Sequence, residues 1–221
     1  MGDQGAKTAL YDAFATVGQA LASGRRAELV EVLAQGERSV DEAAVEIGQS
    51  MANTSQHLRV LARAGLVTSR RDGNRVLYRL AGDEVEALWE ALRAVAAGHV
   101  AGLDRLAADY LGDRDGLEQV DRDELARRLD EEGLVVWDVR PPAEFAAGHV
   151  PGAVSVPPGE VRRRLRELPG RAEVVAYCRG PFCVFADNAV RELTRHGHRA
   201  RRLEDGFPEW RRAGLPVAVG E

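Results

Sequence analysis

Cysteine and lysine are scarce in this 221-residue chain, which has two cysteines, Cys178 and Cys183, and a single lysine, Lys7. Two cysteines are too few for a disulfide-stabilised scaffold or a four-cysteine zinc site. No apolar run reaches the roughly 18 residues of a membrane-spanning helix, so we expect no membrane partner. The N-terminus lacks a basic start followed by an apolar core, as a secretory signal would have, and the expected location is the cytoplasm.

An excess of positive charge is also absent. The chain has 30 Lys and Arg against 35 Asp and Glu, a net charge of −5. Residues 1–112 carry 12 − 15 = −3 and residues 113–221 carry 18 − 20 = −2. This balance excludes a uniformly basic nucleic-acid-binding protein, so any such function needs a local cluster of arginines. Hydrophobic residues at 45% and charged residues at 29% are typical of a folded globular chain.

The sequence divides into a helical half and a half that alternates strands with helices. The polar, glycine-flanked stretch at 112–116 separates them. We therefore predict domains at 1–112 and 117–221, joined by a linker at 113–116. The first is expected to be mainly α-helical with a β-hairpin. The second has short buried strands near 134–137, 153–156 and 173–177, which predicts an α/β fold with a parallel sheet.

Start and stop signals are clear in the helical half. Ser39 followed by Glu42 forms a capping-box pattern, and Ser50 caps the next helix. Asp72-Gly73 lies between two alternating runs and predicts a tight hairpin. A long helical stripe then extends over 83–111.

Two short helices joined at 48–50 and followed by a hairpin predict a winged helix-turn-helix, whose second helix enters the DNA major groove. Asn and Gln can pair with adenine, and arginines at the hairpin tip can contact phosphates. The candidate DNA-binding residues of the second helix are Ser50, Met51, Ala52, Asn53, Ser55, Gln56, His57 and Arg59, and those of the hairpin are Arg70, Arg71, Asn74 and Arg75.

Residues 25–80 resemble the ArsR family of bacterial winged-helix repressors. The resemblance rests on three stretches, at 48–61, 64–67 and 71–80. It implies a homodimer, formed through the first and last helices, that binds a palindromic double-stranded operator. Many members sense metals through cysteines in the helix before the recognition helix. Residues 39–45 contain none, and the last helix offers only His99, so we predict no metal site.

The second half places Cys178 directly after a buried strand and before a helix. Backbone N–H groups and a helix N-terminus converge at such a loop and favour a thiolate, which is the nucleophilic form. Cys178 is therefore the candidate catalytic residue, and the thiolate is expected on it. The rest of the loop comprises Arg179, Gly180, Pro181, Phe182, Cys183 and Val184.

Residues 117–219 resemble a single rhodanese domain. The motifs that carry the resemblance occur in the family's order, at 136–140, 144–153, 175–180 and 203–217. The resemblance implies a persulfide on Cys178, with Asp138 and Arg140 supporting the loop, and no cofactor. Thiosulfate-using members have a basic residue at the position of Cys183 and a hydroxyl at Val184. Pro181 also lacks an N–H, so the loop argues against efficient thiosulfate transfer.

The second thiol leaves two interpretations open. Cys183 could attack a persulfide on Cys178 as a resolving thiol, provided that their Cα atoms lie within about 7 Å, or it could simply pack at the helix start.

The favoured hypothesis is a DNA-binding transcriptional regulator, a repressor of the ArsR type, whose rhodanese domain senses or carries reactive sulfur from polysulfide or thiosulfate. The alternatives are a sulfurtransferase regulated by its DNA-binding half and, more weakly, an arsenic- or metal-responsive repressor.

Overall fold

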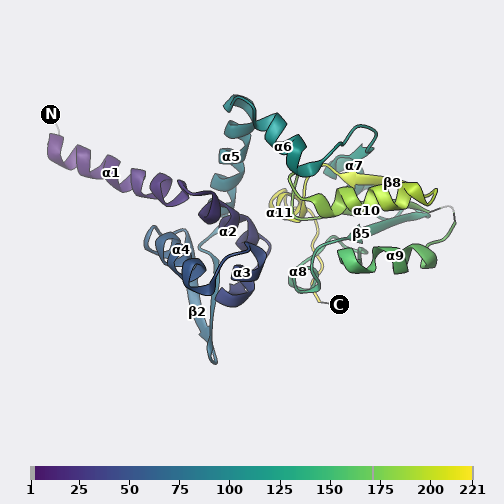
Figure 1. The fold of residues 1–221 in the computed structure, drawn as a ribbon, viewed down its shortest axis with the longest axis horizontal. Helices are drawn as coiled ribbons and strands as arrows, with labels where there is room; N and C mark the ends of the chain where they lie inside the picture. The colour runs from purple at the N-terminus through teal and green to yellow at the C-terminus, as the bar shows by residue number, and fades with distance from the viewer. Residues whose placement is uncertain (1–2, 171, 221) are drawn as a thin grey trace. The chain divides into compact units, whose positions relative to one another are not determined.

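The computed structural model describes residues 3–170 and 172–220 and contains two compact units, Met1–Val95 and Ala96–Glu221 (Figure 1). Each unit has a hydrophobic core of its own. The division lies within one helix, α5 (Asp83–His99), and residues 113–116, the expected linker, belong to the second unit. Within the described ranges, no helix combines the length and apolar character needed to cross a membrane.

The first unit is helical with one small antiparallel sheet of order β1-β3-β2. Its elements before α5 are α1 (Gln4–Leu21), α2 (Gly24–Ala34), β1 (Arg38–Ser39), α3 (Val40–Glu46), α4 (Met51–Arg63), β2 (Val67–Asp72) and β3 (Arg75–Leu80). Leu29, Leu58 and Leu61 are fully buried where α2 and α4 pack together. This is the winged helix-turn-helix that the sequence predicts.

The predicted caps set the boundaries of the two central helices. The Ser39 Oγ accepts a hydrogen bond from the Glu42 N–H at 3.4 Å, and the Glu42 carboxylate accepts one from the Ser39 N–H at 2.9 Å. Ser50 caps α4 by accepting from the Asn53 N–H at 3.3 Å. Gly48, with φ +60°, occupies the left-handed region that ends α3 and turns the chain into α4.

One expected element is divided. The sequence predicts a continuous helical stripe over 83–111, whereas the structure ends α5 at His99 and begins α6 (Leu103–Leu111) only after a short break. Gly102 is the N-cap of α6 and has φ +80°, a conformation that interrupts a right-handed helix. The apolar periodicity continues through this break, so the sequence pattern could not reveal it.

The second unit is built on a five-stranded sheet of order β4-β8-β7-β5-β6, and every pair of neighbouring strands is parallel. The predicted α/β class is therefore confirmed. Besides α6, its elements are β4 (Gln119–Val120), α7 (Arg122–Arg128), β5 (Leu134–Asp138), α8 (Pro142–Ala147), β6 (Val154–Ser155), the 3₁₀ turns Pro158–Glu160 and Leu165–Glu167, α9 (Val161–Arg164), β7 (Glu173–Tyr177), α10 (Val184–Arg195), β8 (Arg199–Leu203) and α11 (Phe207–Arg212).

Alternation along β7 separates two cores on the two faces of this sheet. Val174 and Ala176 belong to the core that contains α9 and α10, whereas Val175 and Tyr177 belong to the core that contains α7 and α11. Cys178 follows β7 on the α10 side and packs in that core. The central strand β7 therefore places the Cys178 thiol beneath α10, the helix that follows the loop.

Candidate functional site

The exposed side of α4 presents its polar side chains on successive turns. Thr54, Leu58 and Leu61 are buried against the first core, and this leaves Asn53, Gln56, Arg59 and Arg63 exposed on the outer surface, together with Met51 and Ala52 at the helix start. The other three candidates on this helix are less accessible or already hydrogen-bonded. Ser50 is the N-cap, and Ser55 and His57 are only half-exposed.

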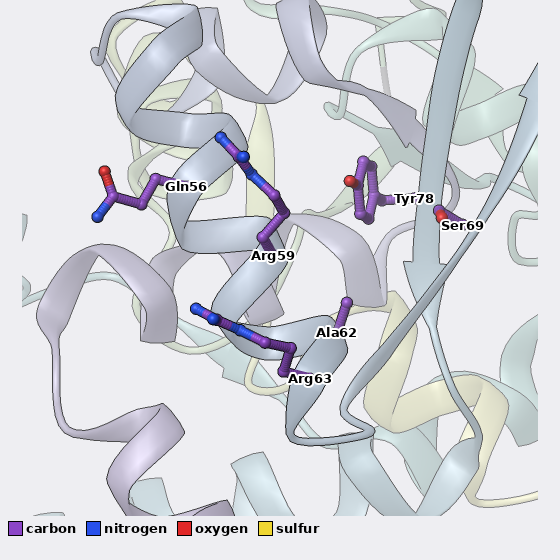
Figure 2. Close-up of a pocket in the computed structure, with 6 residues that line it drawn as sticks. All are labelled: Gln56, Arg59, Ala62, Arg63, Ser69 and Tyr78. Carbon is purple, nitrogen blue, oxygen red and sulfur yellow. The ribbon is translucent and has the colours of Figure 1, made fainter.

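A groove of about 670 Å³ lies between α4 and the β2–β3 hairpin. Figure 2 shows Gln56, Arg59 and Arg63 on successive turns of α4, with Ser69 and Tyr78 on the hairpin strands. Sequence reasoning missed Arg63, Ser69 and Tyr78. For Arg63 a signal existed, because it lies four residues after Arg59 and therefore on the same face of the helix. Ser69 and Tyr78 required the strand register.

The strand register divides the hairpin arginines between two faces. Arg71 pairs with Val76, and Ser69 pairs with Tyr78, so Arg71 lies on the face that borders the groove. Arg70 lies on the opposite face, where its Nε donates to the Glu37 carboxylate at 2.9 Å. Arg75, on that same face, lies 3.7 Å from Glu42, and Asn74 is exposed in the turn. The four predicted hairpin contacts are therefore not equivalent.

The two thiols lie at opposite ends of the loop between β7 and α10. Cys178 is 2% exposed, whereas Cys183 is half-buried and forms the N-cap of α10. The Cys178 thiol lies 3.6 Å from the carbonyl oxygen of Cys183 and 4.0 Å from that of Gly180. The structure thus brings together the two cysteines that the sequence separates by five positions.

The two thiols also influence each other's ionisation, and their pKa values move in opposite directions. Burial raises the pKa of the Cys178 thiol well above its usual range, and the interaction with Cys183 adds to the rise. The hydrogen bond from Cys178, helped by backbone N–H groups and the charge of Arg179, lowers the pKa of Cys183 to about 7. The sequence placed the thiolate on Cys178. Burial disfavours an anion on the deeper sulfur, so the pKa directions of the two thiols favour Cys183, and the expected thiolate on Cys178 stays a prediction.

The Arg179 side chain extends from the loop to Glu144 of α8. Its guanidinium forms a two-pronged ion pair with Glu144 of α8, with N–O distances of 2.6 and 3.1 Å, and the Glu144 side chain is fully buried. The loop also packs closely against the segment before α11. The N–H of Phe207 donates to the carbonyl of Cys178, and a Cβ at Gly206 would collide with the Gly180 backbone. Phe182, Pro181 and Val184 are half-buried around the loop.

Asp138 and Arg140 form a fully buried ion pair beneath this loop. The Arg140 Nε donates to Asp138 at 3.0 Å, and its Nη2 donates to the carbonyl of Gly148 at 2.7 Å. The Tyr177 hydroxyl donates to Asp138 at 2.6 Å and accepts from the Val150 N–H. Burial and the Asp138 charge raise the pKa of Tyr177, which remains a hydrogen-bond donor. These groups fix the strand ends on either side of the loop.

The comparisons with known proteins cover both units. Residues 121–213 match the rhodanese-like domain model and residues 21–70 match a helix-turn-helix domain model. The chain is 44% identical over 219 residues to the HTH-type transcriptional regulator Rv0324 of Mycobacterium tuberculosis, covering 99% of this chain and 96% of that protein. The chain belongs to the HTH-type transcriptional regulators.

The regulator combines a helix-turn-helix domain with a C-terminal rhodanese domain, as the two resemblances in its sequence implied. Its second half is also 34% identical over 107 residues to a sulfurtransferase of Allochromatium vinosum, covering 98% of that protein and 48% of this chain. A solved homodimeric winged helix-turn-helix domain, Mb0332 of Mycobacterium bovis, is 42% identical to it, with a TM-score of 0.42 over 45% of this chain and 93% of that domain.

The different environments of the two thiols predict separate alkylation profiles in the regulator. The alkylation rate of Cys183 should rise through about pH 7, because the thiolate is the reacting form and its pKa lies there. Cys178 should react only at much higher pH. Cleavage after Arg179 separates the thiols into peptides 172–179 and 180–191, so mass spectrometry at a series of pH values reads both. Faster labelling of Cys178 at neutral pH would contradict this assignment.

Proposed function

We propose that the regulator binds operator DNA as a homodimeric repressor and that sulfane sulfur, held as a persulfide on Cys178, changes its operator affinity. The observation that carries the proposal is the thiol pair itself. A half-buried Cys183, whose pKa is lowered to about 7, lies beside a buried thiol at Cys178, within a chain whose other half is a helix-turn-helix domain. A rhodanese fold that only stabilised the chain would need neither thiol.

For DNA binding, α4 enters the major groove and the hairpin lies beside the adjacent backbone. The groove between them is lined by Arg59 and Arg63, and Arg71 lies on the hairpin face that carries Ser69 of the same lining, so these guanidinium groups can contact DNA phosphates. Gln56 and Asn53 lie on the exposed side of α4, where their amides can reach base edges. The clustering of arginines at this face allows an acidic chain to bind a polyanion.

For the homodimer, α1 and α5 present apolar side chains that nothing within the described chain covers. Leu10, Tyr11 and Phe14 of α1 are more than half exposed, and so is Val95 of α5. Burying such surface is favourable at about 25 cal/mol per Å². A second copy that covers α1 and α5 would also pair the two α4 helices, as a palindromic operator requires.

Sulfur enters at the accessible thiolate in the proposed chemistry. Cys183–S⁻ attacks the outer sulfur of a persulfide or polysulfide, R–S–SH, and gives Cys183–S–SH and R–S⁻. Cys178, losing its proton to the leaving sulfur, then attacks the same outer sulfur, which leaves Cys178–S–SH and Cys183–SH. The N–H groups of Gly180 and Ala186 lower the pKa at Cys178 and would favour the persulfide anion there.

A disulfide is the second product that this pair can form. Attack of Cys183 on the inner sulfur of Cys178–S–SH gives the Cys178–Cys183 disulfide and releases hydrosulfide. Two thiols are oxidised and one sulfane sulfur is reduced, so no other oxidant is needed.

The charges around the loop favour a polysulfide over thiosulfate. Arg179 is committed to Glu144, and Pro181 offers no N–H. A doubly charged oxyanion donor would therefore find little compensation at the loop. Sulfurtransferase activity is a second candidate, supported by the likeness to the Allochromatium vinosum sulfurtransferase. It would show as repeated transfer of sulfur to a small thiol, whereas the sensor needs one transfer for each site.

Replacing single hairpin arginines tests the proposed DNA face. Arg71→Ala should weaken operator binding about 5- to 10-fold and lower the slope of log affinity against log salt by about 0.9 for each phosphate that is no longer neutralised. Arg70→Ala is the matched control, because Arg70 faces Glu37, and it should change affinity by less than about twofold. Fluorescence anisotropy with operator DNA at several salt concentrations measures both. Equal reductions in affinity for the two variants would contradict the sorting of the hairpin faces.

The sulfur chemistry is tested by polysulfide treatment, blocking of free thiols and mass spectrometry of peptides 172–179 and 180–191. In the wild type, either added sulfur should appear on the Cys178 peptide, or the two peptides should be linked by a disulfide that retains no added sulfur. Cys178→Ser should retain sulfur on Cys183. Cys183→Ser should load Cys178 more slowly at neutral pH, because the entry thiolate is removed. A wild-type protein that shows neither added sulfur on a peptide nor a disulfide between the two peptides would remove the basis of the proposal.

A further inference from the structure

Residues 111–117, which we call the connecting segment, lie against α10 within the second unit. The side chain of Leu111 is buried, and its carbonyl accepts a hydrogen bond from Arg191 Nη2 of α10 at 3.3 Å. The same Nη2 donates to the carbonyl of Asp113 at 2.5 Å. Leu117 packs against the core that contains Cys178. The connecting segment is therefore fastened to the helix that begins at Cys183.

Arg114 of the connecting segment reaches a buried carboxylate on α10. Its Nε lies 2.6 Å from Asp187 Oδ2, and the Asp187 side chain is fully buried. Arg202 of β8, whose side chain is 4% exposed, lies 3.3 Å from the other oxygen of Asp187. Two arginines thus share one buried carboxylate, and their combined charge exceeds that of Asp187 by one, with Arg202 buried and the Arg114 side chain 23% exposed. Arg114 lies outside both matched domain models.

This charge cluster adjoins the thiol loop from two sides. Asp187 lies four residues after Cys183, one turn along α10 and on the same side of the helix. Arg202 pairs in register with Ala176, and Cys178 follows two positions later on the same face of the sheet. Burial and the nearby charge of Arg114 lower the pKa of Arg202, and a negative charge at Cys178 would oppose that fall.

The cluster is not arranged for stability alone. The Nη2 of Arg114 is buried and forms no hydrogen bond with any residue that the structure describes, and the Nε of Arg202 and the Oδ1 of Asp187 meet only in their 3.3 Å ion pair. Buried polar atoms without hydrogen bonds are destabilising, and one carboxylate cannot compensate two guanidinium groups. A negative charge on the neighbouring sulfurs would supply the missing compensation.

We propose that Arg114 is a positioning residue of the thiol site: its charge, held by Asp187, stabilises anionic sulfur on the Cys178–Cys183 pair and links that pair to the connecting segment. The first half of this inference is a property of the thiols alone. The second half rests on the proposed sensing function. By reciprocity, the factor by which Arg114 favours anionic sulfur equals the factor by which anionic sulfur favours the docked Arg114.

The charged groups beside the thiol loop come from three parts of the unit, and Asp187 is shared between two of them, Arg114 and Arg202. Arg179 on the loop is paired with Glu144 of α8, and Arg202 is shared with Asp187. Arg114 is the member of this set that comes from the connecting segment. A persulfide anion would therefore hold the connecting segment against α10 more firmly than a protonated thiol does.

The pH dependence of thiol alkylation tests the electrostatic half on the full-length protein. Arg114→Gln should move the alkylation profile of the 180–191 peptide upward by about half a pH unit to one unit, which is a threefold to tenfold decrease in rate below the pKa. Arg114→Lys keeps the charge and should restore most of the wild-type profile. Arg195→Gln, at the far end of α10 and paired with Glu192, is the matched control and should leave the profile unchanged. If Arg114→Gln leaves the profile in place and only lowers the melting temperature, Arg114 is merely structural and the inference is wrong.

Hydrogen–deuterium exchange tests the reciprocal half. After polysulfide treatment, the amides of residues 111–117 should exchange several-fold more slowly in the wild type, but not in Arg114→Gln. Unchanged exchange in wild-type protein that mass spectrometry shows to carry sulfur would overturn the link to the connecting segment. Absence of sulfur on the protein would instead overturn the sensing function and leave the alkylation result standing.

Discussion

The closeness of two thiols, Cys178 and Cys183, sets the requirements that the rest of the rhodanese unit meets. Burial raises the pKa of Cys178, and the pKa of Cys183, at the start of α10, is lowered to about 7 beside it. The surrounding loop must hold both sulfurs within reach of each other. Glu144 holds the Arg179 side chain in an ion pair, and the buried Asp138–Arg140 pair fixes the strand ends. Gly206 has no Cβ that would collide with the loop backbone. Each of these contacts restricts the loop rather than supplying a reacting group.

The helix-turn-helix unit must bind a polyanion although the chain as a whole is acidic. This requires that some arginines are not neutralised by carboxylates of the protein and that these arginines face outward. The hairpin register separates the two groups, since Arg70 and Arg75 face Glu37 and Glu42, while Arg71 lies on the strand face that carries Ser69 of the groove. The face of the hairpin that carries Arg71 therefore differs from the opposite face, where Glu37 and Glu42 neutralise Arg70 and Arg75.

The sequence predicts most of the fold because local signals and apolar periodicity agree with the final packing. The capping box at Ser39, the cap at Ser50 and the hairpin at Asp72-Gly73 all lie where expected, and the alternating second half forms a parallel sheet. The break at Gly102 was missed because a helical stripe continues through it. Periodicity records which side of a helix is apolar, and it does not record where the axis changes direction.

The candidate sites were less predictable, because they depend on contacts between residues far apart in the chain. The two cysteines and the loop could be found from the motif, but their relative burial, which decides where the thiolate lies, could not. The Arg179–Glu144 and Arg114–Asp187 pairs join residues 35 and 73 positions apart. In a chain so rich in arginine, no sequence signal distinguishes these two from the others.

The central claim is that sulfur on the thiol pair changes the affinity of the helix-turn-helix unit for DNA. Operator affinity, measured by anisotropy before and after polysulfide treatment and again after reduction, tests it most directly, with the Cys178→Ser/Cys183→Ser double variant as the control. The account predicts that the affinity of the wild type falls about tenfold or more and recovers on reduction, while the double variant does not respond. Unchanged wild-type affinity, in protein that demonstrably carries sulfur on this pair, would contradict it.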